Sequence, residues 1–77
     1  MVKVTTKDLK KLYDEMLEFV INKVIEYEDS QVVASTMVAH ALKLYRSTLT
    51  DEEFKDMLKI VVKNAKKSLP YKIAKLH

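Results

Sequence analysis

The side chains that could do chemistry are few in this sequence, and their spacing suits a catalytic site poorly. His40 and His77 are the two imidazoles, and the chain contains no cysteine. A thiolate zinc site is therefore excluded, and two histidines alone fit a histidine-based metal site badly. No carboxylate lies three or four residues from His40, although a general acid or base needs a positioned partner. We expect His40 to be a partly exposed structural residue.

Carboxylates cluster at Glu26, Glu28 and Asp29, and again in the run 51–53. Hard cations prefer oxygen ligands, but a calcium loop needs alternating ligands and a glycine at its sharp turn. Neither feature is present, so we interpret both clusters as helix-end residues. The sequence therefore predicts no metal site, no cofactor and no catalytic residues, and we expect that the protein is not an enzyme.

The lysines form the most uneven charge pattern in the chain. Residues 54–77 contain seven lysines and one acid. On a helix, lysines repeating every four residues share one ridge, and the ridge with its neighbour comprises Lys55, Lys59, Lys63, Lys66 and Lys67. Such a ridge could contact nucleic-acid phosphates, an acidic partner or a membrane surface, or it could simply be a solvated face. A single arginine argues against base-specific readout, which favours bidentate side chains.

The complete absence of glycine excludes several classes of site. Phosphate-binding loops, dinucleotide turns and nucleophile elbows all depend on glycine. With 77 residues, 48% apolar and 32% charged, the chain is predicted to be one globular domain, 1–77. No apolar run is long enough to span a membrane, and the lysine-rich start lacks the apolar segment of a signal peptide. We expect a cytoplasmic protein that uses oligomerisation to support a small core.

Three helices are predicted, at about 6–28, 30–48 and 51–68, with a tail at 69–77. A hydroxyl cap followed by Asp8 predicts the first helix start. Asp29 or Ser30 could cap the second helix, and the pair Thr50 and Glu53 predicts a capping box at the third. The third helix is expected to end before Pro70, because the residue preceding a proline avoids the helical region.

The connection at 28–30 is ambiguous because neither glycine nor proline interrupts it. A heptad-like row of mostly apolar residues, from Tyr13 to Tyr45, passes through this connection with steps of three and four. That row is typical of one long helix, about 6–48, in a coiled-coil-like dimer. A break at 28–30, giving the compact three-helix form, is the favoured interpretation.

The apolar face of the first helix is wider than one small bundle requires, which indicates a second partner on another side. Small residues in the second helix allow close approach of another helix. We expect an all-α three-helix bundle that self-associates as a homo-oligomer, with a homodimer as the expected form. The candidate self-association residues are Leu17, Ile21, Ile25, Tyr27, Ala34, Val38, Ala41 and Tyr45.

One segment, 34–57, resembles small uncharacterised helical proteins encoded by tailed bacteriophages. The resemblance consists of an alanine-rich helix ending in Leu44-Tyr45-Arg46, then Leu49, the acidic cap 51–53 and Phe54. It covers about a third of the chain and implies no activity and no functional residues. The sequence as a whole predicts a non-enzymatic protein–protein interaction module, and a phage accessory protein if the resemblance holds. The alternative is a non-specific nucleic-acid-binding accessory protein that uses the lysine ridge.

Overall fold

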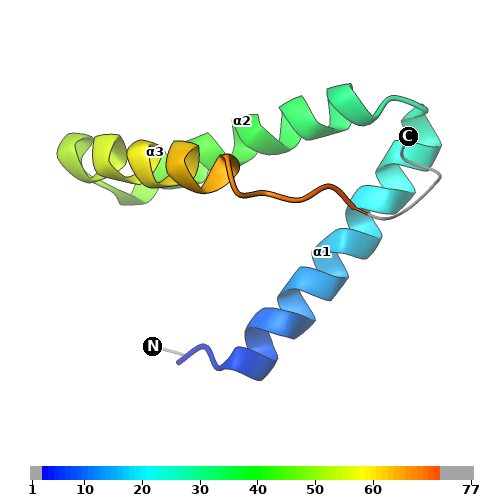
Figure 1. Ribbon diagram of the computed structural model, residues 1–77, viewed down its shortest axis with the longest axis horizontal. Helices are drawn as coiled ribbons and strands as arrows, with labels where there is room; N and C mark the ends of the chain where they lie inside the picture. Colours follow the sequence, from blue (N-terminus) through cyan, green and yellow to red (C-terminus); the bar gives the residue numbers. More distant parts are fainter. Residues whose placement is uncertain (1–2, 72–77) are drawn as a thin grey trace.

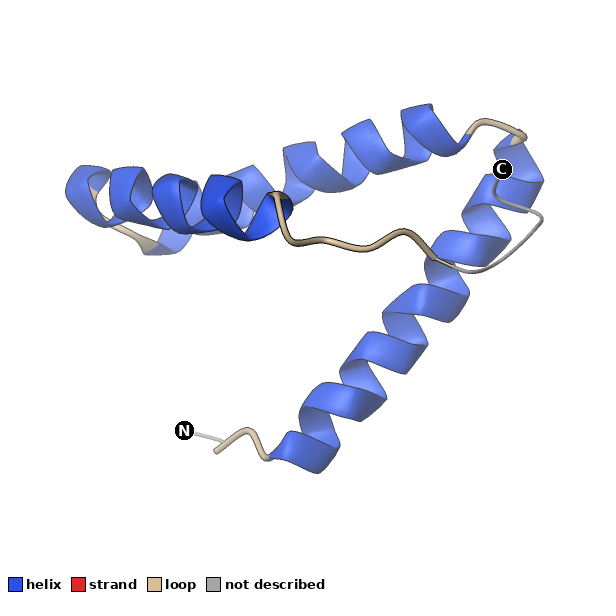
Figure 2. Ribbon diagram, viewed as in Figure 1, coloured by secondary structure: helices blue, strands red, loops and turns tan. Residues whose placement is uncertain are grey.

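The chain folds as three helices, as the sequence predicts. The computed structural model describes residues 3–71, and within them the helices are α1 (Thr6–Tyr27), α2 (Ser30–Thr48) and α3 (Asp51–Ala65). Loops of two residues separate the helices, and the described residues include no strand (Figure 2). The predicted all-α, three-helix class is confirmed. No helix in this described part is both long enough and apolar enough to cross a membrane.

Capping boxes begin α1 and α3. At α1, the Thr5 hydroxyl accepts from the Asp8 N–H at 3.1 Å, and the Asp8 carboxylate accepts from the Thr5 N–H at 3.1 Å. At α3, Thr50 and Glu53 make the same reciprocal pair at 3.2 and 2.9 Å. Each box satisfies two backbone donors that a helix start leaves without a helical partner. Both starts lie where the hydroxyl and carboxylate spacing predicts them.

The corner between α1 and α2 decides the question that the sequence left open. Glu28 adopts a left-handed conformation, φ 53° and ψ 30°, and its N–H still donates to the Val24 carbonyl. Asp29 then caps α2 by accepting from the N–H groups of Gln31 and Val32. The alternative of one helix over 6–48 is therefore wrong, since the left-handed residue reverses the backbone and the aspartate starts a new helix.

Arg46 connects α2 to α3 across the corner between them. Its guanidinium Nη1 lies 2.9 Å from Asp51 Oδ1, across the two-residue loop. The same guanidinium stacks over the Phe54 ring, 4.7 Å from the ring centroid. One side chain from the last turn of α2 thus contacts the first turn of α3 twice.

The end of α3 comes earlier than predicted. The helix ends at Ala65 rather than at 68, and the N–H groups of Lys67 and Ser68 donate to carbonyls three residues back. This tighter turn unwinds the chain before the restricted Leu69-Pro70 step. Of the predicted tail 69–77, only 69–71 lies within the described residues.

The three helices form an open arrangement. In Figure 1, α3 runs back beside α2, while α1 diverges from both and the segment after α3 crosses towards α1. The radius of gyration is 14.5 Å, against about 11.5 Å for a compact domain of this length. Only Val20 and Val24 are buried among the described apolar residues. The core of the isolated chain is therefore confined to the second half of α1.

Candidate interaction surface

The two halves of α1 differ in how far they are covered. In the second half, Val20 and Val24 are each 9% exposed, and Leu17 and Ile21 are half-buried. In the first half, no described residue is buried. Because successive residues on a helix are rotated by about 100°, the four covered residues share one side of α1. This side is the inner face of the isolated chain.

A second apolar side of α1 is open to solvent. Leu9, Leu12, Met16 and Phe19 are 57%, 53%, 54% and 61% exposed, and we call these four residues the outer stripe. Their centre lies about 80° around the helix from Val20 and Val24. Steps of three, four and three are those of a coiled-coil seam. The outer stripe therefore has the pattern of a helix-packing surface with nothing packed on it.

The outer stripe was missing from the self-association residues predicted from sequence. That prediction followed the heptad-like row through 28–30, and the break at Glu28 interrupts the row. The three–four–three spacing within 9–19 is the signal that could have identified the stripe. It is hidden in the sequence because the inner and outer faces merge into one wide apolar band.

The predicted self-association residues do not form one surface in this structure. Leu17, Ile21 and Tyr45 are half-buried, and the other five are exposed: Ile25, Tyr27, Ala34, Val38 and Ala41. They are divided between the second half of α1 and the length of α2. The structure therefore keeps several of them available for a partner but does not align them along one helix.

The lysine ridge runs along one edge of the apolar face of α3, since Lys55 and Lys59 lie next to Val62 around the helix. Lys55, Lys59 and Lys63 belong to the helix, and Lys66 and Lys67 follow in the turn. All five are exposed, and none of them makes an ion pair within the described chain. The apolar face of α3 is only partly covered by the rest of the chain, because Val61 and Val62 are 43% and 60% exposed. The second half of α3 thus combines uncovered apolar residues with unpaired positive charge.

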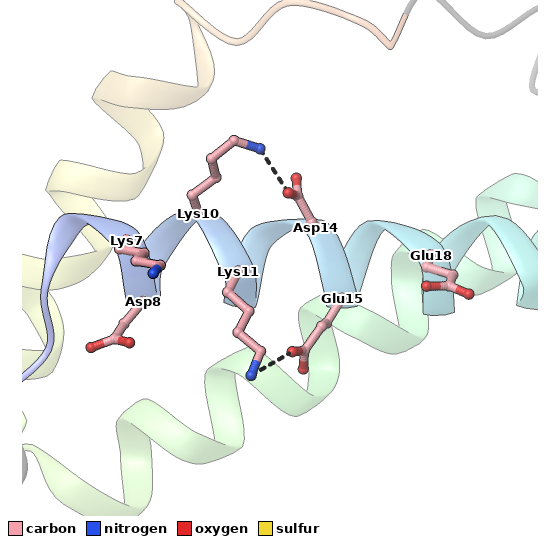
Figure 3. A pocket seen from close by; sticks show the side chains of 7 residues that line it. All are labelled: Lys7, Asp8, Lys10, Lys11, Asp14, Glu15 and Glu18. Atoms are coloured by element: carbon pink, nitrogen blue, oxygen red, sulfur yellow. Dashed lines mark hydrogen bonds and ion pairs between the residues drawn. The ribbon is translucent and has the colours of Figure 1, made fainter.

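Ion pairing in the described residues is local. Lys10 lies 2.7 Å from Asp14, Lys11 lies 3.8 Å from Glu15, and both pairs follow one side of α1 (Figure 3). The hydrogen bond that Lys10 donates to the Asp14 carboxylate raises the pKa of Lys10. The shallow hollow around these residues is lined by α1 alone, from Lys7 to Glu18. A hollow on one exposed helix, with Lys10 and Lys11 already paired, offers no enclosed site for a substrate.

Lys23 connects the outer stripe to the end of α1. Its ammonium lies 5.5 Å from the Phe19 ring centroid, 6.0 Å from that of Tyr27, and 2.9 Å from Glu26 Oε2. The hydrogen bond to Glu26 raises the pKa of Lys23. These contacts keep a positive charge and two aromatic rings together beside the stripe, as aromatic–cation contacts favour.

After α3, the chain comes back to α1, and Tyr71 interacts with Tyr13 there. Burial and the neighbouring Tyr13 hydroxyl raise the pKa of Tyr71. Tyr13 belongs to the first half of α1, next to the inner face. The contact therefore ties the segment after Pro70 to α1 and leaves the outer stripe uncovered.

The residues considered for chemistry do not converge. His40 is exposed on α2, and His77 lies outside the described residues. Within 3–71, no three histidine, aspartate or glutamate side chains are placed to hold a metal ion. Glu26, Glu28 and Asp29 are found at the helix ends to which the sequence assigned them.

Comparison with known proteins adds no family to this description. No family model matches the chain, and no match is found among the curated proteins or the solved structures. The resemblance to bacteriophage proteins therefore stays a prediction. The outer stripe, the exposed end of α3 and the lysine ridge are the features on which a function can be argued.

Proposed function

We propose that this protein is a non-enzymatic helical interaction module that packs its exposed apolar helix faces against other protein chains. One observation carries the proposal. The chain exposes 7393 Å², whereas a folded monomer of 9.0 kDa exposes about 4,900 Å². Apolar area removed from water is the main favourable term in association, so this excess surface is what a partner would cover.

The outer stripe supplies the residues for this role. Four large apolar side chains at helix-packing spacing form a larger continuous patch than scattered surface leucines, and such patches mark interaction sites. Helix α1, which carries all four residues, begins with a capping box, so the surface is presented on a regular element. The cysteine-free sequence fits a cytoplasmic setting, and the bacteriophage resemblance adds the narrower proposal of a phage accessory protein.

Variants of the stripe test the proposal. The double variant Leu12→Ser with Met16→Ser should abolish both self-association and retention of any protein partner on the immobilised chain. Leu44→Ser on α2, which changes a still more exposed leucine outside the stripe, should leave both unchanged. Circular dichroism should report the same helix content for all three proteins. An assembly that survives the double variant, or no assembly and no stripe-dependent partner at all, would overturn the proposal.

The lysine ridge supports a second candidate function, non-specific binding of nucleic acid. Five exposed lysines without ion pairs lie together on α3 and the turn after it. Arg46 takes no part, because Asp51 and Phe54 engage it. Phosphate contacts by lysine release counterions, so affinity would fall with salt and carry little sequence preference.

A salt series with duplex and single-stranded DNA separates the two functions. If the ridge binds phosphates, Lys59→Glu with Lys63→Glu should weaken binding and reduce the salt slope by about two. Lys43→Glu, an exposed lysine on α2, is the matched control and should change the slope little. Absence of binding at low salt removes this candidate and leaves the interaction module unaffected.

A further inference from the structure

Two helices of this chain have apolar faces bordered by charges of opposite sign. The outer stripe of α1 is bordered by Asp8, Glu15 and Glu26, which fall within about 20° of each other around the helix. The exposed apolar side of α3 is bordered by Lys55, Lys59 and Lys66, which fall within about 40° of each other. Each helix thus presents an apolar strip with one charged edge, basic on α3 and acidic on α1, where Lys23 lies in line with the stripe and pairs with Glu26.

The two edges do not meet within one chain. Every ion pair of the described residues joins positions no more than five apart, and none connects α1 with α3. Glu15 and Glu26 pair with lysines of α1 itself, and their side chains remain 62% and 54% exposed. Figure 1 shows the first half of α1 directed away from α3. An acidic edge and a basic edge that form no ion pair with each other among the described residues of one chain can do so between two chains.

The uncovered area has the size of an obligate dimer interface. The chain exposes 7393 Å², an excess of about 2,500 Å² over a compact monomer of its mass. Two chains would together cover about 5,000 Å², at the upper end of the range for obligate homodimers. A short peptide or a small ligand would leave most of this surface exposed.

We propose that the occupant is a second copy of this chain, and that the outer stripe of α1 in each copy packs against α3 of the other. This proposal rests on the interaction-module function and specifies its partner. A two-fold axis produces two equivalent α1–α3 contacts, so the assembly closes as a dimer. In each contact, Leu12 and Met16 cover Val61 and Val62, and the acidic edge of one copy follows the basic edge of the other.

Charge reversal of one edge at a time tests this arrangement. One variant carries Glu15→Lys with Glu26→Lys, and the other carries Lys55→Glu with Lys59→Glu. Each variant alone places like charges in both contacts of its homodimer. Sedimentation equilibrium should therefore show self-association weakened by about thirtyfold, since four exposed pairs change from attraction to repulsion.

Mixing the two variants provides the decisive measurement. In a mixed dimer, the reversed α1 meets the reversed α3, and the unchanged α1 meets the unchanged α3, so both contacts are attractive again. We expect a heterodimer as stable as the wild-type dimer and detectable by native mass spectrometry. Pairing of two α1 helices with each other would instead leave the α3 variant fully dimeric, because that variant does not change α1.

Two matched controls lie outside the proposed contacts. Glu18→Lys reverses a charge on the far side of α1, and Lys43→Glu reverses one on α2. Both should dimerise like the wild type. A wild type that remains monomeric up to its solubility limit, or a variant mixture that stays monomeric or unfolded, would overturn the second-copy proposal. The interaction-module function would then still be decided by stripe-dependent retention of a different protein.

Discussion

The α2–α3 corner has a capping box, an ion pair and an aromatic contact, whereas the α1–α2 corner has an aspartate cap beside a left-handed glutamate. Charge also differs between them. The positive charge of Arg46 in the last turn of α2 interacts favourably with the helix dipole. The last turn of α1 contains no basic residue, and the negative charge of Glu28 after it interacts unfavourably with the dipole. Local side-chain chemistry therefore fixes the α2–α3 hairpin, and the direction of α1 depends more on what covers its apolar faces.

Among the substitutions that test the difference between the two corners, Arg46→Ala is expected to change the free energy of unfolding most. The substitution removes the Asp51 ion pair and the stack on Phe54 together. We expect the free energy of unfolding in urea to fall by about 1.5 kcal/mol. Lys43→Ala, three residues earlier on the same helix, should cost less than about 0.5 kcal/mol. Equal losses for the two variants would show that the corner contacts contribute nothing specific.

The capping box at the same corner should contribute somewhat less. Thr50→Ala removes the hydroxyl that accepts the Glu53 N–H, and we expect a loss of about 1 kcal/mol in the free energy of unfolding. Thr50→Ser keeps the hydroxyl and should retain most of that stability. If the serine variant unfolds as easily as the alanine variant, the hydrogen bond is not the source of the effect.

The α1–α2 corner should respond in the opposite direction. A left-handed conformation is unfavourable for a residue with a Cβ but not for glycine. Glu28→Gly should therefore raise the free energy of unfolding by about 0.5 to 1 kcal/mol. Glu28→Gln removes the charge and keeps the side chain, so thermal unfolding of the two variants separates backbone strain from dipole repulsion. If Glu28→Gly instead lowers the free energy of unfolding, the left-handed backbone of Glu28 is not a source of strain.

The smallest expected effect is a pH dependence acting on the α2–α3 corner through Glu53. The Thr50 N–H donates to the Glu53 carboxylate and lowers its pKa, as the Thr5 N–H does for Asp8. A carboxyl whose folded pKa is lowered stabilises the fold above its unfolded pKa, and this stability is lost as pH falls through the folded pKa.

Helix content followed by circular dichroism should therefore decrease as the pH is lowered below about 4.3, the ordinary value for glutamate. Glu53→Gln keeps a capping acceptor that does not titrate, so this variant should show a shallower decrease. An identical acid transition in both proteins would assign the pH dependence to other groups.

These corners also show which parts of the fold are readable from sequence. Thr50 with Glu53, and Thr5 with Asp8, are short-range patterns whose partners lie three residues away, and both predicted helix starts are confirmed. The break at 28–30 is favoured from the sequence, and Asp29 is a candidate cap that the structure confirms. The left-handed conformation of Glu28 has no such pattern, because glutamate rarely adopts it. Helix α3 was predicted to continue to 68 because Pro70 was the visible stop, and the turn after Ala65 has no comparable signal.

Only part of the candidate interaction surface could be predicted from the sequence, because the missing information also lies in the backbone angle at Glu28. Apolar spacing shows that α1 has more apolar positions than one partner can cover. It does not show which of them the chain itself covers, because that depends on the angle at Glu28. Leu17 and Ile21 are half-buried by the fold, while Leu12 and Met16 are left exposed. Of the lysine ridge, which follows from the four-residue repeat alone, Lys55, Lys59 and Lys63 lie on α3, whereas Lys66 and Lys67 follow its end at Ala65.

The local character of the ion pairs has a consequence for folding kinetics. When stabilising contacts join residues close in sequence, little chain entropy opposes their formation, and such elements form in about microseconds to milliseconds. The capped α2–α3 hairpin can therefore form early, at a rate independent of protein concentration. In the proposed dimer, the outer stripe is covered only when two molecules meet, so the rate of that step would increase with concentration. Stopped-flow refolding would then resolve a first-order phase followed by a second-order one.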